Sequence, residues 1–307
     1  MLDTTLAILL TVVAAATPLV FAALGELITE KSGVLNLGVE GMMLMGAIAA
    51  FAVGISTGSS MLAILGGAAA GMAMAALFAL MVLGLLSNQV ATGLALTIFG
   101  VGLSALVGKG FVGTPLPALD KLDIPGLTDL PFVGPLLFGQ DFLVYLSFVM
   151  LVVVAWFLGK SRAGLILRAV GESHDAAHAI GYSVMKVRLL AILFGGAMSG
   201  LGGAYLSLAY TPMWVENMTA GRGWIALALV VFGTWRPLRA FAGAYLFGGV
   251  TILQLHAQGF GFNVPAQFWS MLPYLATIVV LVMISRDQTL VRLNAPACLG
   301  KVFVKTK

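Results

Sequence analysis

Charged and amide side chains interrupt an otherwise apolar stretch at residues 25–50, and side chains of these types could bind a polar molecule or a proton. In chain order they are Glu26, Glu30, Lys31, Asn36 and Glu40. A charged side chain at the centre of a bilayer costs about 2.5–3.5 kcal/mol on insertion scales. Carboxylates between lipid-soluble flanks therefore indicate contact with protein, with water or with a transported molecule.

Two interpretations of this stretch stay open. Residues 29–33 could form a cytoplasmic hairpin between two ordinary helices, with Glu30 and Lys31 in solvent. Asn36 and Glu40 instead lie inside the apolar run, and broken helices near the midplane are where transporters often bind their cargo. We predict that Asn36 and Glu40 line a pathway through the membrane.

Three neutral polar residues, Asn88, Gln89 and Thr92, open a later apolar segment and are further candidates for the same pathway. Their amide and hydroxyl groups could hydrogen-bond to a polar molecule. Buried groups of this kind often form only interhelical hydrogen bonds in membrane proteins. A structural role is therefore the alternative for each of them.

The composition indicates which elements must carry these side chains. Of 307 residues, 60% are apolar and 9% are charged, whereas soluble domains have about 25% charged residues. We expect an all-α, polytopic membrane helix bundle that forms a single transmembrane domain over residues 1–307. The net charge of +4 fits basic cytoplasmic loops rather than nucleic-acid binding. One cysteine, Cys298, permits no internal disulfide.

Apolar windows of about 20 residues, the length that crosses a bilayer, give a series of expected spans. They lie near residues 6–28, 34–54, 61–86, 88–108, 140–159, 188–210, 222–234, 240–258 and 267–284. The stretch 25–50 and the short span 222–234 could each be broken or re-entrant, so we expect about 8–10 crossings. Residues 109–139 are rich in proline, which excludes a continuous helix and predicts an irregular external loop.

The placement of lysine and arginine gives the expected orientation. Basic side chains gather in residues 160–188 and at Arg236 and Arg239. The last part of the chain contributes Arg286, Arg292, Lys301, Lys305 and Lys307. By the positive-inside rule these segments are cytoplasmic, and an odd number of crossings then places the N-terminus outside.

The cytoplasmic segment 160–188 contains an amphipathic pattern that predicts a helix over residues 163–180. Its expected apolar side consists of Leu165, Ile166, Ala169 and Val170. A short helix outside the membrane could receive motion from a soluble partner. A solvated linker is the alternative.

Metal and nucleotide chemistry are not expected in this chain. His174 and His178 are four residues apart and could share a helix face, but neither a third ligand nor a metalloprotease glutamate accompanies them. The run Gly159-Lys160-Ser161 lacks the glycine five residues earlier that a phosphate-binding loop requires, because position 154 is valine. We expect no metal site and no cofactor.

Three blocks of the sequence resemble the permease subunits of bacterial ABC-type importers, in the branched-chain amino acid, ribose and simple-sugar permease superfamily. They are GELITEKSGVLNLGVEGMMLMGA at 25–47, GLILRAVGESHDAAHAIGYSV at 164–184 and GRGWIALALVVFGTWRPLRAFAGAYLFGG at 221–249. Within the superfamily, the blocks resemble the shorter permease of nucleoside-uptake systems. His174 and Asp175 depart from the Asn and Pro that relatives often carry.

The resemblance implies an assembly in the bacterial inner membrane. A second, longer permease paralogue would complete the pathway, a cytoplasmic ABC ATPase would hydrolyse ATP, and an external binding lipoprotein or periplasmic protein would deliver a nucleoside. The second block would be the loop that couples to the ATPase. The residues expected to act in it are Arg168, Gly171, Glu172 and Gly181.

Other functions stay open at this stage. A permease of the same superfamily could carry a simple sugar or an amino acid, although the block at 33–41 argues against an amino acid. A stand-alone proton-coupled carrier could use Glu26 and Glu40 as its proton site. An intramembrane enzyme has little support, because the sequence offers no Ser/His, His-cluster or paired-Asp arrangement.

Overall fold

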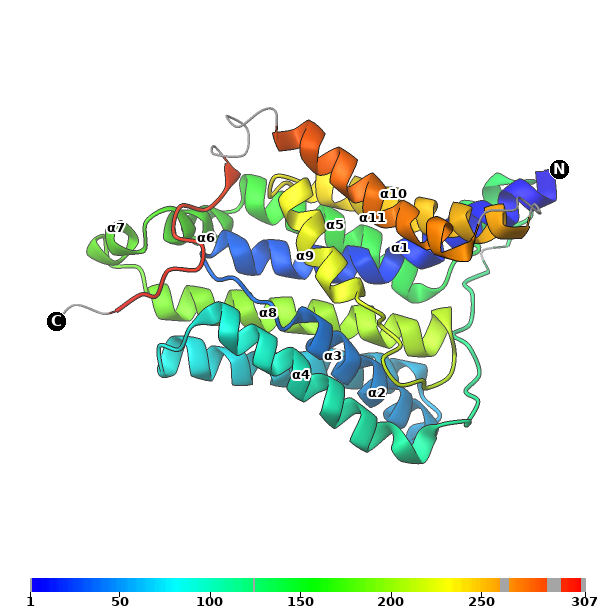
Figure 1. Ribbon diagram of the computed structural model, residues 1–307, viewed down its shortest axis with the longest axis horizontal. Coiled ribbons are helices and arrows are strands. Elements are labelled where there is room, and N and C mark those ends of the chain that lie inside the picture. The colour runs from blue at the N-terminus through cyan, green and yellow to red at the C-terminus, as the bar shows by residue number, and fades with distance from the viewer. Residues whose placement is uncertain (1, 124, 260–264, 286–293, 305–307) are drawn as a thin grey trace.

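A computed structural model of the protein describes residues 2–123, 125–259, 265–285 and 294–304. This part of the chain is a bundle of helices (Figure 1), and within it the only β-pairing consists of isolated bridges. The expected all-α, multi-pass membrane architecture is confirmed. Arg286, Arg292, Lys305 and Lys307, on which the orientation partly relied, lie outside the described residues.

The predicted spans correspond to long helices. These are α1 Leu2–Lys31, α2 Val39–Thr57, α3 Ser60–Ala79, α4 Gln89–Gly108, α5 Phe142–Lys160, α8 Val184–Tyr205, α10 Pro237–Gly259 and α11 Ala266–Ser285. Short π-helices at Leu80–Gly84 and Leu206–Tyr210 prolong α3 and α8. In the described residues, 7 helices are long and apolar enough to cross a membrane, and α9, Arg222–Phe232, is a shorter apolar helix.

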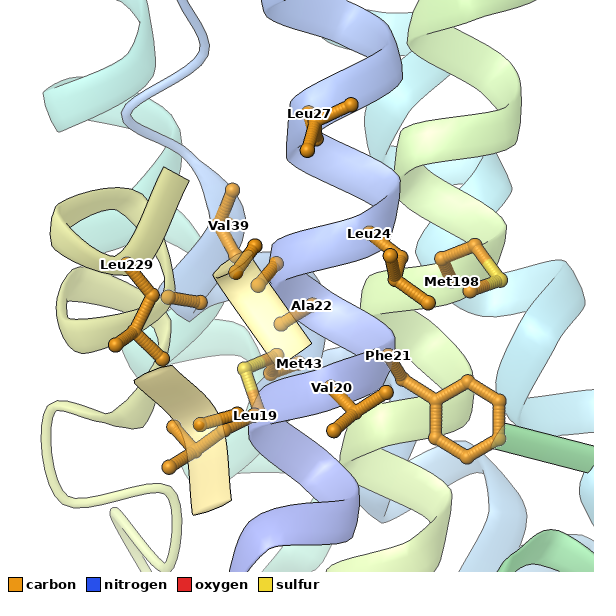
Figure 2. Packing of buried hydrophobic residues seen from close by; sticks show 14 of the residues in the cluster. Leu19, Val20, Phe21, Ala22, Leu24, Leu27, Val39, Met43, Met198 and Leu229 are labelled. Carbon is orange, nitrogen blue, oxygen red and sulfur yellow. The ribbon is translucent and has the colours of Figure 1, made fainter. Parts of the chain in front are cut away.

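Helix α1 is the centre of the bundle. Residues 15–30 are buried throughout, and they pack against α8, α9 and α10. Figure 2 shows Leu19, Val20 and Phe21 on this helix among buried side chains such as Met43 and Met198. Because α1 faces protein on all sides along this stretch, its carboxylates Glu26 and Glu30 lie in the interior rather than in solvent.

Glycines allow α8 to approach α2 and α3 backbone to backbone. A Cβ at Gly71 would lie 2.2 Å from the carbonyl oxygen of Gly196, and one at Gly46 would lie 2.5 Å from Cα of Gly200. Lipid provides no hydrophobic drive for helix association, so membrane helices gain from close packing through small residues. This requirement explains why so many glycines occur in the spans.

The polar connections lie at the two ends of the bundle. The segment after α4, which includes the predicted irregular loop 109–139, lies at the same end as the N-terminus (Figure 1). Helices α6, Arg162–Glu172, and α7, His174–Ala179, project from the opposite end. This arrangement agrees with the two sides expected from the basic residues.

Three sequence predictions need correction in detail. The second span was expected from residue 34, but α2 begins at Val39, because residues 32–38 are not helical. The helix expected over 163–180 is two helices separated at Ser173, whose hydroxyl caps α7 by accepting from the Ala176 N–H. Leu165, expected on the apolar side, is 59% exposed, whereas Val170, expected on the same side, is buried together with Leu167.

Candidate functional site

Two interrupted elements meet in the interior of the bundle. Residues 32–38 separate α1 from α2, and residues 211–221 separate the end of α8 from α9. Helix α9 (yellow in Figure 1) covers only part of the bundle's length. The starts of α2 and α9 touch, since a Cβ at Gly223 would lie 2.6 Å from Cα of Glu40. We call this contact the interior junction.

Glu40 holds the interior junction together. One carboxylate oxygen accepts hydrogen bonds from Thr219 Oγ1 at 2.5 Å and from the Gly221 N–H at 2.8 Å. The other accepts from the Gly223 N–H at 2.6 Å. The first N–H groups of a helix lack intrahelical partners and carry the positive end of its dipole. Glu40 therefore supplies both the acceptors and the negative charge that the start of α9 needs.

Asn36 positions the non-helical residues 32–38. Its side-chain oxygen accepts from the Gly38 N–H at 2.9 Å, and its own backbone N–H donates to Glu26 Oε1 at 3.0 Å. Asn36 is fully buried. In the described part of the chain, the other oxygen of Glu26 has no hydrogen-bond partner. A carboxylate of α1 thus fixes the chain just before α2.

Glu30 contacts a residue that sequence reasoning did not single out. Trp235, between α9 and α10, donates its indole N–H to Glu30 Oε2 at 2.5 Å. Both side chains are buried, at 1% and 6% exposure. The hairpin interpretation, with Glu30 in solvent, is therefore wrong, although the chain does turn at Gly33, whose φ of +86° favours glycine.

The three candidates at the start of α4 have local roles. Asn88 is exposed and caps the helix by accepting from the Ala91 N–H at 3.0 Å. Gln89 is buried and accepts from the Leu35 N–H at 2.8 Å, which joins α4 to the non-helical residues 32–38. Thr92 pairs with the Ser87 hydroxyl at 2.8 Å. For all five pathway candidates, contact with a transported molecule stays a prediction.

The residues expected to couple to a partner face different surroundings. Glu172 and Gly181 are exposed, and Gly181 has a φ of +92° in the turn after α7. Arg168 is half-buried. Gly171 is buried, since a Cβ there would lie 2.2 Å from the Lys31 carbonyl oxygen. Gly171 therefore packs inside this chain, and partner docking stays a prediction for the loop.

Arg188, which sequence reasoning used only for orientation, is a fully buried cation beside this loop. Its guanidinium donates to the carbonyl oxygens of Ser32 at 3.2 Å and Lys301 at 3.1 Å. A third nitrogen lies 3.4 Å from Nδ1 of His174. In the sequence, the feature that could have indicated this buried role is a lone arginine at the start of an apolar span.

Burial shifts the ionisation of two groups at the ends of the bundle. The pKa of His174 is lowered by burial and then by the positive charge of Arg188; the carboxylate of Asp175 opposes this shift, and Lys301 lowers the pKa by a smaller amount. The pKa of Asp141, which caps α5, is raised by burial. In the described ranges, no group of three or more His, Cys, Asp or Glu side chains could hold a metal ion.

The long apolar helices, with two interrupted elements joined inside them, define a multi-pass membrane protein. The sequence model of one family, the branched-chain amino acid transport system permease component, matches residues 8–281. The chain belongs to this family of ABC transporter permeases. The resemblance found in the sequence is therefore confirmed.

Relatives at 30–43% identity cover nearly the whole chain. TsgC13 of Haloferax volcanii, provisionally named a glucose ABC transporter permease protein, is 43% identical over 94% of each chain. The guanosine permease NupQ of Bacillus subtilis and the nucleoside permease NupC of Lactococcus lactis are each 30% identical, over 95% of this chain and 94% of their own lengths. Each of these two organisms also has a second, more distant matching permease for the same substrate class. No solved structure matches the chain.

Proposed function

We propose that this chain is the membrane-spanning subunit of an ATP-driven importer and forms half of the pathway for a neutral, hydroxyl-rich solute. The observation that carries the proposal is the interior junction, in which helix starts from two interrupted elements meet inside the bundle. Interrupted helices in transporters lie where cargo crosses the midplane. Of the five polar candidates, Asn36 and Glu40 belong to these elements and Gln89 is hydrogen-bonded to one of them.

The hydrogen bonds already made by the buried carboxylates Glu40 and Glu30 favour a neutral substrate. Both oxygens of Glu40 are already bonded to the start of α9, and Glu30 is bonded to Trp235. In the described residues, no lysine or arginine forms an ion pair with these carboxylates. An amino-acid substrate would bring two charges that need partners of opposite sign, so a neutral solute fits this interior better.

A simple sugar is the first substrate to test, because the relative with 43% identity is named for glucose. A nucleoside, the first expectation from the sequence, is the second candidate, because relatives named for guanosine and nucleosides match at 30% identity. Both substrates offer hydroxyl groups to neutral hydrogen-bonding side chains.

The proposed assembly contains further subunits. A second permease would complete the pathway, and the two matching permeases found in each of two organisms that carry relatives of this chain support this. A cytoplasmic ABC ATPase would contact α6 and α7, whose exposed tip includes Ile180 at 71% exposure. An external binding protein would deliver the solute, and the assembly would lie in the inner membrane.

Uptake by whole cells tests this proposal. Cells that carry the chain with its partner subunits are supplied with labelled glucose or labelled guanosine, with and without the gene for the ATPase. We expect uptake of one of the two solutes only when the ATPase is present. Uptake that persists without the ATPase and collapses with the proton gradient would contradict the proposal and support a stand-alone carrier that uses Glu26.

A further inference from the structure

A short segment near the end of the chain, residues 294–304, runs back across the end of the bundle that carries α6 and α7 (red in Figure 1). We call it the C-terminal strap. It contains no long helix, yet Cys298 and Phe303 are buried, at 7% and 5% exposure. Asn294 and Lys301 are the only residues of this mostly apolar segment with a polar or charged side chain, and specific contacts hold the segment against the bundle.

One set of contacts joins the C-terminal strap to α6 and α7. The Cys298 N–H donates to the Gly171 carbonyl at 2.8 Å, and its thiol lies 3.4 Å from the Glu172 carbonyl oxygen. Further along, the ring of Phe303 packs edge-on against both His174 and His178, with centroid distances of 5.3 and 5.5 Å. The strap therefore holds the end of α6 and one face of α7.

A second set joins the same strap to the chain that leads into the interior junction. Lys31 donates to the Asn294 carbonyl at 2.6 Å, and the Gly300 N–H donates to the Gly33 carbonyl at 3.2 Å. The Lys301 carbonyl accepts from Gln89 at 3.4 Å. Gln89 also accepts a hydrogen bond from the Leu35 N–H. The strap therefore contacts residues 32–38 directly at Gly33 and indirectly through Gln89.

Arg188 connects the two sets of contacts. Its guanidinium binds the Ser32 carbonyl on the interior side, His174 on the loop side and the Lys301 carbonyl on the strap. A buried charge that loses its hydrogen bonds carries a large desolvation penalty. Arg188 therefore holds residues 32–38, α7 and the strap together. Separating any of them from Arg188 would leave part of its buried guanidinium without a hydrogen-bond partner.

We propose that the C-terminal strap and Arg188 link α6–α7 to residues 32–38, so that movement of the cytoplasmic loop is passed to the interior junction. Gly171 also packs directly on Lys31, and the strap extends this contact to Gly33 and Gln89. The inference rests on the proposed function, because it requires an ATPase that moves α6–α7. The strap residues are positioning residues, since they act through others and touch no substrate.

The test measures solute transported per ATP hydrolysed by the complete transporter in proteoliposomes. Phe303→Ala removes the ring between the two histidines, and a stop after Leu299 also removes the contacts of Gly300 and Lys301. Val304→Ala is the matched control, because Val304 lies beside Phe303 but is 62% exposed. Cys298 is the only cysteine of the chain, so its rate of maleimide labelling reports whether the strap has been displaced.

We expect both strap variants to label faster at Cys298 and to transport several-fold less solute per ATP, while ATP hydrolysis continues and Val304→Ala behaves as the wild type. Faster labelling with an unchanged ratio of transport to hydrolysis would overturn the inference. So would an equal fall of transport and hydrolysis, because that result indicates a purely structural role. A wild-type transporter that needs no ATP would instead overturn the proposed function itself.

Discussion

Replacement of Glu40 by glutamine is the sharpest perturbation of the interior junction. The substitution keeps the length and shape of the side chain but replaces one carboxylate oxygen with an NH₂ group, which cannot accept a hydrogen bond. In the structure, Glu40 accepts from three donors, Thr219, Gly221 and Gly223, and both of its oxygens are used. Either orientation of the amide therefore leaves at least one donor of the α9 start without an acceptor.

The size of the effect follows from these contacts. A hydrogen bond to a charged group contributes about 1.5–3 kcal/mol, and a buried donor left unpaired costs about 1–3 kcal/mol. The favourable interaction of a carboxylate with the helix dipole adds about 0.3–1 kcal/mol. Glu40→Gln should therefore destabilise the folded protein by about 2–4 kcal/mol.

The assay is thermal unfolding of the purified protein in detergent, followed by the loss of the monodisperse peak in size-exclusion chromatography. Glu216→Gln is the matched control, because Glu216 lies in the same connection before α9 but is exposed. Thr219→Val removes one of the three donors. Combined with Glu40→Gln it should cost less than the sum of the single changes, because the two residues share a bond.

Two results would refute the reasoning about Glu40. The first is a melting temperature of Glu40→Gln equal to that of Glu216→Gln. The second is strict additivity of Glu40→Gln and Thr219→Val, which would mean that the two side chains do not interact in the membrane protein.

Three more predictions concern other parts of the bundle. Gly71→Ala should lower the melting temperature and the yield of folded protein, because its Cβ would lie 2.2 Å from a carbonyl of α8, whereas Gly102→Ala, in open space, should not. Asp141→Ala should cost about 1–2 kcal/mol in thermal unfolding through loss of the α5 cap, and Asp141→Asn less. The lowered pKa of His174 means that the unfolded chain takes up the proton first as pH falls, so stability should decrease below about pH 6.5. His174→Gln should flatten that decrease in melting temperatures recorded from neutral to acidic pH, and an unchanged slope would contradict the assignment.

The positions of the long helices could be predicted from sequence, because apolar windows long enough for a bilayer have few alternatives. The break before α2 could be predicted only in part. The sequence showed Asn36 and Glu40 inside an apolar run, but the partner of Glu40 lies 179 residues away at Thr219. Local patterns carry no information about which distant backbone groups a carboxylate will meet.

The missed features share the same physical cause. Trp235 resembles an interfacial aromatic residue, and only the fold brings it to Glu30, 205 residues away. The C-terminal strap is mostly apolar in sequence but too short to span a membrane, and nothing local to it indicates that it contacts α6, α7 and residues 32–38. The break at Ser173 is the exception, because serine is a common helix N-cap and therefore a local signal, and Ser173 caps α7 by accepting from the Ala176 N–H.

The central claim is that this chain is a permease subunit driven by a separate ATPase, and reconstitution tests it most directly. Proteoliposomes that contain the complete transporter are loaded with ATP or with a non-hydrolysable analogue, and uptake of labelled glucose and guanosine is followed with and without a protonophore. We predict that solute accumulates only with hydrolysable ATP and that the protonophore has no effect. Accumulation with the analogue that the protonophore abolishes would contradict the claim.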